Sequence, residues 1–321
     1  MVLRIGILGA ARIAPPALIQ PARAIGGVEA VAVGASDAAR AAAFAAEHGL
    51  SAFGTREDLL ARNDLDMIYV ALPPSDHAAW SIRALQTGKH VLCEKPFAMS
   101  AAETEAVQAA AAGAGKRVIE ATHYRYHPLM ARVLEILNSG VLGPIVSAEA
   151  AFHVPVRDAA DEFRRTKALG GGCLRDIGFY PLHALRTLFG EPVGFSDAIA
   201  TWIGDRVDES YSASLHFADG LAAQLTCGMA LTEQPRAMIT LVGERGTLSA
   251  RNFVGPHFGA SIRLSLADQD TGGEENVTTR PTFFYQLEAV RDALASGAVL
   301  STEGADILAN MRAMDALYAL V

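Results

Sequence analysis

The sequence predicts an α/β protein: an N-terminal Rossmann-type, doubly wound parallel sheet, then a C-terminal α/β domain with a large, mostly antiparallel open sheet. Over the first 122 residues, short β-branched runs alternate with alanine-rich helical stretches, which is the pattern of βαβ units. From about residue 195 to 266, strand-like runs dominate with few helices between them, as is typical of antiparallel pairing. We therefore predict two domains, residues 1–122 and residues 123–321.

The first domain begins with an apolar stretch that arginine and glycine interrupt, so we predict a strand there and not a signal peptide. The strands are predicted at 3–8, 28–34, 66–72, 90–93 and 117–121. Helical segments between them are predicted at 37–49 and 75–88, with Gly88 as the C-cap of the second.

The second domain opens with mixed elements before its run of strands. Helices are predicted at 127–140, 180–190, 283–297 and 303–320, and a strand at 144–156. The polar run 268–276 is predicted to be an exposed hairpin tip or loop.

Composition excludes several classes of partner. With 27 basic and 35 acidic side chains, the net charge of −8 argues against a nucleic-acid or anionic-membrane partner, which needs a basic face. No apolar stretch approaches the roughly 18 residues of a membrane span. Cys93, Cys173 and Cys227 form no CxxC pair, so we expect a reducing, cytoplasmic setting with no disulfide framework and no metal site.

A dinucleotide fingerprint follows the first strand. In "GILGAARIA", Gly9, Ala11 and Ala14 have the spacing of GxGxxG, with alanine at the second and third places. Glycine makes the turn, and a small second residue lets the backbone approach a pyrophosphate. Pro15 and Pro16 are expected in the first helical turn, where a missing N–H costs little. The alternative is a tight turn without a ligand.

The end of the second strand is expected to meet the adenosine ribose. Its tip carries Gly34, Ala35 and Ser36, with Asp37 just beyond and Arg40 a turn later. Without an acid at the tip, a 2′-phosphate is not repelled and meets Ser36 and Arg40, which favours NADP; NAD stays open. Asp37 is expected mainly as a helix N-cap.

Two further motifs carry side chains suited to acid–base chemistry. In "HVLCEKPF" (90–97), Lys95 follows a strand whose carboxyl end is expected near a nicotinamide. In "GGGCLRDIGFY" (170–180), we expect a helix start that puts Asp176 and Tyr180 one turn apart on one face. Taken singly, these residues are more often a solvated charge, a helix cap and a core aromatic.

A secondary alcohol can lose a hydride to nicotinamide while a base takes its hydroxyl proton. The unperturbed pKa of tyrosine is about 10, and a nearby ammonium group lowers it. We therefore expect Tyr180 as the acid/base, Lys95 as its polarising partner, and Asp176 as the group that orients the substrate or Lys95.

The motifs together resemble the glucose–fructose oxidoreductase/inositol dehydrogenase/MocA (Gfo/Idh/MocA) family. The resemblance rests on "TGKHVLCEKPF", "VALPPSDHAAWSIRALQTG", "EATHYRYHPLM", "GGGCLRDIGFYPLHALR" and "LVGERGTLSA", and is strongest to its dimeric dihydrodiol and aldose dehydrogenase branch. It implies an NAD(P)-dependent oxidoreductase acting on a sugar, polyol or cyclic diol. It also implies active-site roles for Lys95, Asp176 and Tyr180, a homodimer or homotetramer, and a final helix that returns to the first domain.

The expected contacts follow from these motifs. Cofactor contacts are expected from Gly9, Ala11, Arg12, Ile13, Ser36, Asp37, Arg40, Leu72, Pro73, His77, Glu94 and Lys95. Substrate contacts are expected from Lys95, Arg125, Asp176 and Tyr180. Roles are left open for His123, His153, Arg164, Arg165 and His183, with structural roles favoured. Two other functions stay open: a dinucleotide-responsive regulator without turnover, and an NAD-retaining glycosidase-like enzyme.

Overall fold

The computed structural model describes residues 2–159, 162–267 and 273–321. The chain divides into two compact units. The first comprises the residues up to His123 together with Phe283–Met311, and the second comprises Tyr124–Thr282 together with Arg312–Val321. The last helix, α10 (Ala305–Tyr318), therefore has its first half in one unit and its second half in the other.

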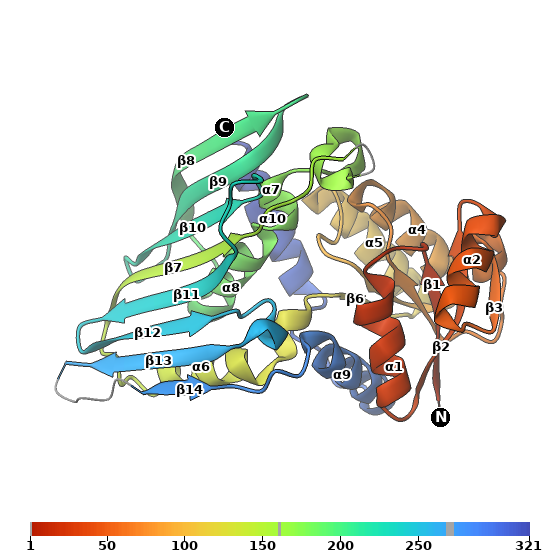
Figure 1. The fold of residues 1–321 in the computed structure, drawn as a ribbon, viewed down its shortest axis with the longest axis horizontal. Coiled ribbons are helices and arrows are strands. Elements are labelled where there is room, and N and C mark those ends of the chain that lie inside the picture. The colour runs from red at the N-terminus through yellow and green to blue at the C-terminus, as the bar shows by residue number, and fades with distance from the viewer. Residues whose placement is uncertain (1, 160–161, 268–272) are drawn as a thin grey trace. The chain divides into compact units, whose positions relative to one another are not determined.

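The first unit contains, among the described residues, a six-stranded parallel sheet in the order β3-β2-β1-β4-β5-β6 (Figure 1). Its strands are β1 Leu3–Leu8, β2 Val28–Ala35, β3 Ala52–Thr55, β4 Met67–Val70, β5 His90–Cys93 and β6 Val118–Glu120. Its helices are η1 Pro15–Ile19, α1 Gln20–Ala24, α2 Ala38–His48, α3 Arg56–Leu60, α4 Pro74–Gln86, α5 Ala101–Ala114 and α9 Thr282–Ser296. The strand order reverses between β1 and β4, the point where such sheets bind ligands at their carboxyl edge.

Both faces of this sheet are covered, which explains its uniformly apolar strands. In β4, Met67 and Tyr69 pack into a core cluster that includes residues of η1, α2 and α9. Ile68 and Val70 point the other way, into a cluster with residues of α3, α4 and α5. Successive strand side chains alternate in direction, so every position of a doubly covered strand is buried.

Short-range signals set the helix ends in this unit. The Asp37 carboxylate accepts a hydrogen bond from the Ala39 amide, which confirms its predicted role as N-cap of α2. Helix α2 ends at Gly49, which has a φ of 61°. Helix α4 ends one position before the prediction, with Thr87 as C-cap and Gly88 following at a φ of 78°.

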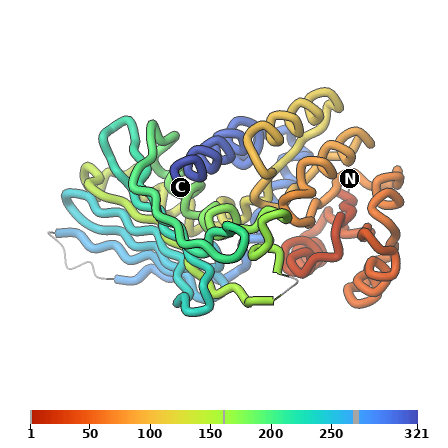
Figure 2. The backbone as a smooth tube through the Cα atoms, turned by 90° about the horizontal axis from the view of Figure 1, so that it is seen from above, coloured from red at the N-terminus to blue at the C-terminus, as the bar shows by residue number. Residues whose placement is uncertain are grey.

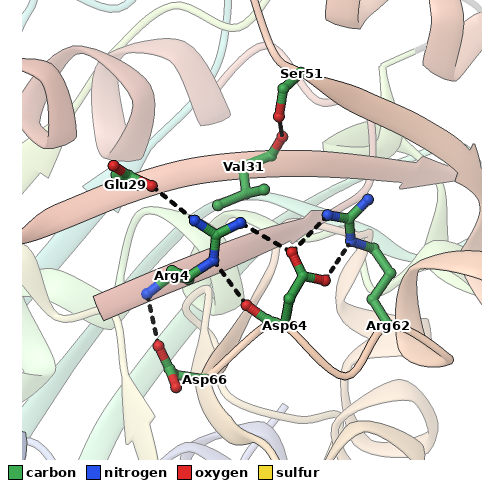
Figure 3. Close-up of polar contacts among 7 residues, drawn as sticks. All are labelled: Arg4, Glu29, Val31, Ser51, Arg62, Asp64 and Asp66. Carbon is green, nitrogen blue, oxygen red and sulfur yellow. Dashed lines mark hydrogen bonds and ion pairs between the residues drawn. The ribbon is translucent and has the colours of Figure 1, made fainter. Parts of the chain in front are cut away.

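An arginine at the amino end of β1 ties neighbouring segments together (Figure 3). The Arg4 guanidinium donates to Glu29 at 3.0 Å and to the Asp64 carboxylate at 2.9 Å. Arg62 also donates to Asp64, and the two arginines lower the pKa of Asp64 to about 2. These pairs are exposed, so they contribute little to stability. They neutralise one another at the sheet edge opposite the fingerprint turn.

The second unit contains, within the described ranges, an eight-stranded sheet in the order β14-β13-β12-β11-β7-β10-β9-β8 (Figure 1). The strands are β7 Ile145–His153, β8 Gly194–Ile203, β9 Val207–His216, β10 Ala222–Gly228, β11 Arg236–Gly243, β12 Gly246–Arg251, β13 Ser261–Leu266 and β14 Glu274–Asn276. Only the β7–β10 pair among these is parallel. The predicted open, mostly antiparallel sheet is confirmed.

Helices cover one face of this sheet, whose strands form a single layer in the view of Figure 2. The helices are η2 His123–Tyr126, α6 Pro128–Asn138, η3 Phe163–Arg165, η4 Lys167–Leu169, α7 Cys173–Asp176, α8 Phe179–Phe189 and η5 Pro256–Phe258. Strand β11 shows the consequence, because Ala237, Ile239 and Leu241 are buried and the alternate positions are more exposed.

The predicted single helix start at "DIGFY" is wrong. Asp176 is the last residue of α7, and Tyr180 is the second residue of α8. The Gly178 amide donates to the Cys173 carbonyl at 2.8 Å, five residues back, which interrupts the regular helical ladder. Gly178 is also required sterically, because a Cβ there would come within 2.8 Å of Leu174. The two site residues therefore lie on consecutive short helices.

The other sequence predictions fare differently by segment. The strands predicted at 3–8 and 90–93 have the predicted bounds. Within the polar run 268–276, Glu274–Asn276 forms β14 against β13, and residues 268–272 lie outside the described residues. No helix in the described parts of the chain is long and apolar enough to cross a membrane.

Candidate active site

The fingerprint turn has the geometry that a dinucleotide requires. Gly9 has a φ of 113°, and a Cβ at this position would lie 2.4 Å from the Ala71 carbonyl oxygen. Its amide donates to the Gly34 carbonyl at 2.8 Å, which draws the end of β1 against β2. Helix η1 begins at Pro15, so both prolines lie in its first turn as predicted. Only glycine fits the first place, and the small Ala11 leaves the turn open to a pyrophosphate.

The carboxyl end of β2 offers donors and no uncommitted acid. Ser36, Asp37 and Arg40 are exposed. The Asp37 carboxylate is engaged as a helix cap, and Arg40 Nη2 donates to the Ala10 carbonyl at 3.1 Å. Arg40 therefore lies against the fingerprint turn. A hydroxyl and a guanidinium beside this turn suit a 2′-phosphate.

A pocket of about 270 Å³ opens elsewhere in the first unit, at the amino ends of β1 and β2. Its two arginines are engaged, Arg4 with Glu29 and Asp64, and Arg23 with the His48 carbonyl. Because the fingerprint turn follows the opposite ends of these strands, this pocket is separate from the dinucleotide site.

The residue before Lys95 is fixed by a buried contact. The Tyr69 hydroxyl in β4 donates to the Glu94 carboxylate just after β5. Tyr69 is fully buried and Glu94 is 8% exposed. The Glu94 amide also donates to the Val70 carbonyl at 3.0 Å. The backbone that enters Lys95 is thus held to the neighbouring strand.

The residues after Lys95 are fixed as well. The Phe97 amide donates to Glu120 Oε1 at 2.8 Å, and the Thr122 hydroxyl donates to Oε2 of the same carboxylate at 3.1 Å. Glu120 is fully buried at the end of β6. Lys95 itself is half-buried. A half-buried ammonium on a loop pinned on both sides is a suitable catalytic group, because its position is preorganised.

His77 joins two loops at this edge of the sheet. It lies in the first turns of α4, is 1% exposed, and has one ring nitrogen at each of two carbonyl oxygens. Nδ1 lies 2.8 Å from the Pro96 carbonyl, and Nε2 lies 2.7 Å from the Leu72 carbonyl. His77 therefore contacts the Lys95 loop in addition to the predicted cofactor loop.

In the second unit, the glycine run brings two segments close together. A Cβ at Gly171 would lie 2.6 Å from the Arg164 carbonyl oxygen, and the Gly172 amide donates to the same oxygen at 2.9 Å. Gly172 has a φ of 130°. The predicted close backbone approach is confirmed, and its effect is to hold residue 164 beside α7.

Arg164 forms an ion pair with the candidate site residue Asp176. Its Nε donates to Asp176 Oδ2 at 2.5 Å, and its Nη1 donates to Glu162 Oε1 at 2.8 Å. Both carboxylates are more than nine-tenths buried. The Asp176 charge raises the pKa of Arg164 further above its ordinary value, so the cation is permanent. Asp176 is thus presented as an oriented acceptor and is not a helix cap.

Tyr180 has its ring clamped in the core of the second unit. It is 5% exposed, and its ring makes edge contacts with Phe152 and Phe179 at centroid distances of 5.5 Å and with Tyr124 at 5.9 Å. These contacts fix the direction of the ring, which a general acid or base requires.

A buried carboxylate anchors α7 from behind, and sequence reasoning missed it. Asp208 Oδ2 accepts from the Leu174 amide at 2.6 Å, and Oδ1 accepts from the Tyr318 hydroxyl at 3.0 Å. Asp208 is 2% exposed, and burial raises its pKa. No motif signals this contact, because its partners are 34 and 110 residues away in the sequence.

The residues whose roles were left open mostly have structural partners. His183 and the Tyr124 hydroxyl lie 2.6 Å apart in the core, and the ring of His123 stacks on Phe283 at 4.3 Å. Contacts of His153 reach Glu233 and Thr226, and Arg165 donates to two backbone carbonyls and to Glu209. Arg125 is half-buried in η2.

Each unit therefore assembles part of the predicted site. In the first, His77 brings the Leu72–Pro73 loop together with the loop of Glu94 and Lys95. In the second, Asp176 and Tyr180 lie on α7 and α8, with Arg164 as the unpredicted addition. Across residues 2–159, 162–267 and 273–321, no three His, Cys, Asp or Glu side chains are grouped to hold a metal ion.

Comparison with known protein families identifies both parts of the chain. Residues 3–122 match the family described as "Oxidoreductase family, NAD-binding Rossmann fold". Residues 130–249 match the GFO/IDH/MocA C-terminal domain.

Individual relatives cover almost the whole chain. A D-xylose 1-dehydrogenase (NADP(+)) of Haloferax volcanii is 33% identical over 98% of this chain and 95% of its own length. A trans-1,2-dihydrobenzene-1,2-diol dehydrogenase of Xenopus laevis is 30% identical over 83% of this chain and 81% of its own length.

Among solved structures, a 3-ketoreductase from Actinomadura kijaniata in complex with NADP and TDP-benzene has a TM-score of 0.91 and 29% identity. The match covers 99% of this chain and 98% of the ketoreductase. Other structures of that ketoreductase carry a tyrosine replaced by phenylalanine, or a lysine replaced by alanine or glutamate.

Proposed function

The chain belongs to the Gfo/Idh/MocA family, whose members are oxidoreductases with an NAD-binding Rossmann fold, and we propose that it transfers a hydride between nicotinamide and a sugar, polyol or cyclic diol. The reacting group is a secondary alcohol in one direction and a carbonyl in the other. The observation that carries the proposal is the anchored Lys95, held on both sides by buried contacts at the carboxyl edge of a dinucleotide-type sheet.

The first unit binds the cofactor in this proposal. Gly9, Ala11, Arg12 and Ile13 form the turn that receives the pyrophosphate. The 2′-phosphate of NADP is held by Ser36 and Arg40, whose exposed positions beside the fingerprint turn support this preference over NAD. The cofactors named for the Haloferax and Actinomadura relatives are NADP, which supports the same preference.

The acid–base chemistry is assigned to Lys95, Asp176 and Tyr180. A bound nicotinamide dinucleotide supplies the hydride acceptor or donor. Tyr180 takes the hydroxyl proton of the alcohol, or returns it to the carbonyl oxygen in reduction. The Lys95 ammonium favours the tyrosinate, and Asp176, kept charged by Arg164, accepts a hydrogen bond from a substrate hydroxyl. The substituted residues in the ketoreductase structures are also a lysine and a tyrosine.

The remaining expectations complete the proposal. Residues 1–122 hold the dinucleotide, and residues 123–321 hold the substrate and form a homodimer or homotetramer. Arg125 contacts the substrate. A cytoplasmic location stays a prediction from the cysteine usage, and the three cysteines are free and buried.

The test is an activity assay over a panel of alcohols. Purified protein is incubated with D-xylose and other aldoses, cyclic polyols or trans-dihydrodiols, and with NADP⁺ or NAD⁺ in parallel. We expect reduced nicotinamide to form on at least one aldose or diol. We also expect a kcat/KM for NADP⁺ at least about tenfold above that for NAD⁺, since one charge-assisted contact contributes about 1.5–3 kcal/mol.

Three results would overturn parts of this proposal. Binding of dinucleotide with no turnover of any alcohol or carbonyl would indicate a regulator. Dinucleotide retained through purification, with glycoside cleavage and no net change in its reduction state, would indicate a glycosidase-like enzyme. A preference for NAD⁺ would move the ribose contact from Ser36 and Arg40 to Asp37.

A further inference from the structure

His77 has a hydrogen-bonding geometry that a neutral histidine cannot satisfy. Its two ring nitrogens lie 2.8 Å and 2.7 Å from the carbonyl oxygens of Pro96 and Leu72. Carbonyl oxygens only accept hydrogen bonds, and neutral imidazole has one donor and one acceptor nitrogen. In the neutral form, one nitrogen lone pair therefore faces a carbonyl lone pair. Only the imidazolium cation, with two N–H donors, makes both bonds.

The surroundings of His77 oppose this cation in the free protein. Burial lowers the pKa of His77, and the ammonium of Lys95, on the loop after β5, lowers it further. The two carbonyl contacts and the carboxylate of Asp76 on α4 raise it. Asp76 is itself paired with Arg56 at 3.0 Å, which reduces its influence. The two carbonyls thus ask for a charge that burial and Lys95 resist.

The position of His77 shows what can settle this balance. Leu72 follows β4, which flanks the point where the strand order reverses, and Pro96 follows Lys95 at the end of the adjacent β5. Ligands of such sheets bind outside these carboxyl ends. A dinucleotide is an anion, and a nearby anion favours the charged form of histidine.

We propose that His77 is a positioning residue for Lys95 which becomes an imidazolium cation when a dinucleotide binds, so that cofactor binding takes up a proton. As a cation it ties the Pro96 carbonyl, one residue from the candidate catalytic lysine, to the cofactor loop at Leu72. Binding of the cofactor and placement of the lysine are then coupled. The inference rests on the proposed function, because it requires that the first unit binds a nicotinamide dinucleotide.

The proton uptake is measured by isothermal titration calorimetry. NADH is titrated into the protein near pH 7.5 in buffers of different ionisation enthalpy, and the slope of binding enthalpy against ionisation enthalpy gives the protons taken up. NADH is the probe because it lacks the 2′-phosphate, which titrates near neutral pH itself. We expect wild type to take up about 0.5 proton or more, and His77→Gln about none, because an amide has one donor and one acceptor in this range.

His90→Gln is the matched control. His90 is a half-buried histidine at the start of β5, where its Nδ1 accepts from the Arg117 amide at 3.0 Å. It lies at the other end of the strand from Lys95. This variant is expected to keep the wild-type proton uptake.

A second measurement decides the question without any variant that must fold perfectly. Ring-nitrogen NMR of histidine-labelled wild type distinguishes neutral imidazole from imidazolium. We expect one histidine to gain a second ring proton when NADH is added, and this signal to be missing or shifted in His77→Gln. Where His77→Gln is unfolded, His77→Asn serves to assign it.

The outcomes separate the inference from the proposed function. Binding of NADH with equal proton uptake in wild type and His77→Gln, or a ring that stays neutral in the complex, overturns the role of His77 and leaves the oxidoreductase untouched. Absence of NADH and NADPH binding in folded wild type overturns the proposed function as well. In turnover, His77→Gln is expected to lower kcat about tenfold or more with little change in the substrate KM, as misplacement of a catalytic group predicts.

Discussion

Arg164 and Arg165 are neighbours in the sequence but have different partners. Arg164 donates to the buried carboxylates of Asp176 and Glu162. Arg165 donates to the carbonyls of Val156 and Arg157 and to Glu209, away from the candidate site. One arginine therefore orients a candidate substrate-binding group, and the other fastens a loop.

Replacing Arg164 tests whether it positions Asp176 for the substrate. Arg164→Ala is expected to raise the substrate KM about tenfold or more, because Asp176 loses a charge-assisted hydrogen bond of about 1.5–3 kcal/mol. Dinucleotide affinity is expected to stay unchanged, since Arg164 belongs to the second unit. Steady-state kinetics and a dinucleotide titration measure the two effects.

The controls for this experiment are close at hand. Arg164→Lys keeps the charge but loses the fork that donates in two directions, so it is expected to restore only part of the lost affinity. Arg165→Ala removes a guanidinium of similar exposure that does not contact Asp176, and should leave the substrate KM near that of wild type. Equal effects of Arg164→Ala and Arg165→Ala on KM would contradict the positioning role.

Motifs identified some of these residues and not others, for a physical reason. Lys95, Asp176 and Tyr180 stand in short motifs, so their chemistry is legible in the sequence. The partners that orient them are set by tertiary packing. Arg164 reaches Asp176 because the glycine run folds back on it, and Asp208 reaches α7 from a strand 34 residues later. No local pattern specifies such contacts.

At the scale of elements, the glycine run determines where α7 begins. Gly172 is the N-cap of α7 and has a φ of 130°, which L-residues with a side chain rarely adopt. Its missing Cβ leaves room for Asp208 Oδ1 and the Tyr318 hydroxyl, which would lie 2.3 Å and 2.8 Å from such an atom. The start of the helix that carries Asp176 is thus built around the absence of a side chain.

Gly172→Ala is expected to damage both stability and activity. Strain and the displaced contacts are expected to lower the free energy of unfolding by about 2 kcal/mol or more. Movement of α7 is expected to raise the substrate KM as well. Urea denaturation and steady-state kinetics measure the two effects.

Gly140→Ala is the matched control for this change. Gly140 also has a positive φ, 70°, but a Cβ there meets no atom within 4 Å. It therefore carries the backbone cost alone, about 1 kcal/mol, with unchanged activity. A Gly172→Ala variant no less stable than Gly140→Ala would show that the close contacts at α7 do not matter.

The elements themselves differed in how well the sequence predicted them. Fully buried strands such as β1 and β5 are continuous apolar runs and have the predicted bounds. Strand β3 was not predicted because it is short and half-exposed, and its sequence, AFGT, contains a glycine. The break between α7 and α8 was missed because both sides are helical in sequence pattern, and only the packing of Gly178 against Leu174 reveals it.

At the scale of the whole molecule, the account assigns one half of the chemistry to each unit. Lys95 belongs to the unit with the parallel sheet, and Tyr180 to the unit with the open sheet. Neither unit carries both groups, so the proposed mechanism requires the two to act on one substrate. This requirement is the central claim, and it is stronger than dinucleotide binding alone.

A double-mutant cycle between Lys95 and Tyr180 tests the claim most directly. Lys95→Met and Tyr180→Phe, singly and together, are assayed for kcat with the substrate and dinucleotide identified by the activity assay, and each variant is checked for dinucleotide binding. We predict that each single change lowers kcat about 100-fold or more, as loss of acid–base catalysis does. We also predict that the double variant is little worse than the worse single variant, because the lysine acts through the tyrosine. Multiplying effects, or a Tyr180→Phe enzyme with unchanged kcat, would contradict the account.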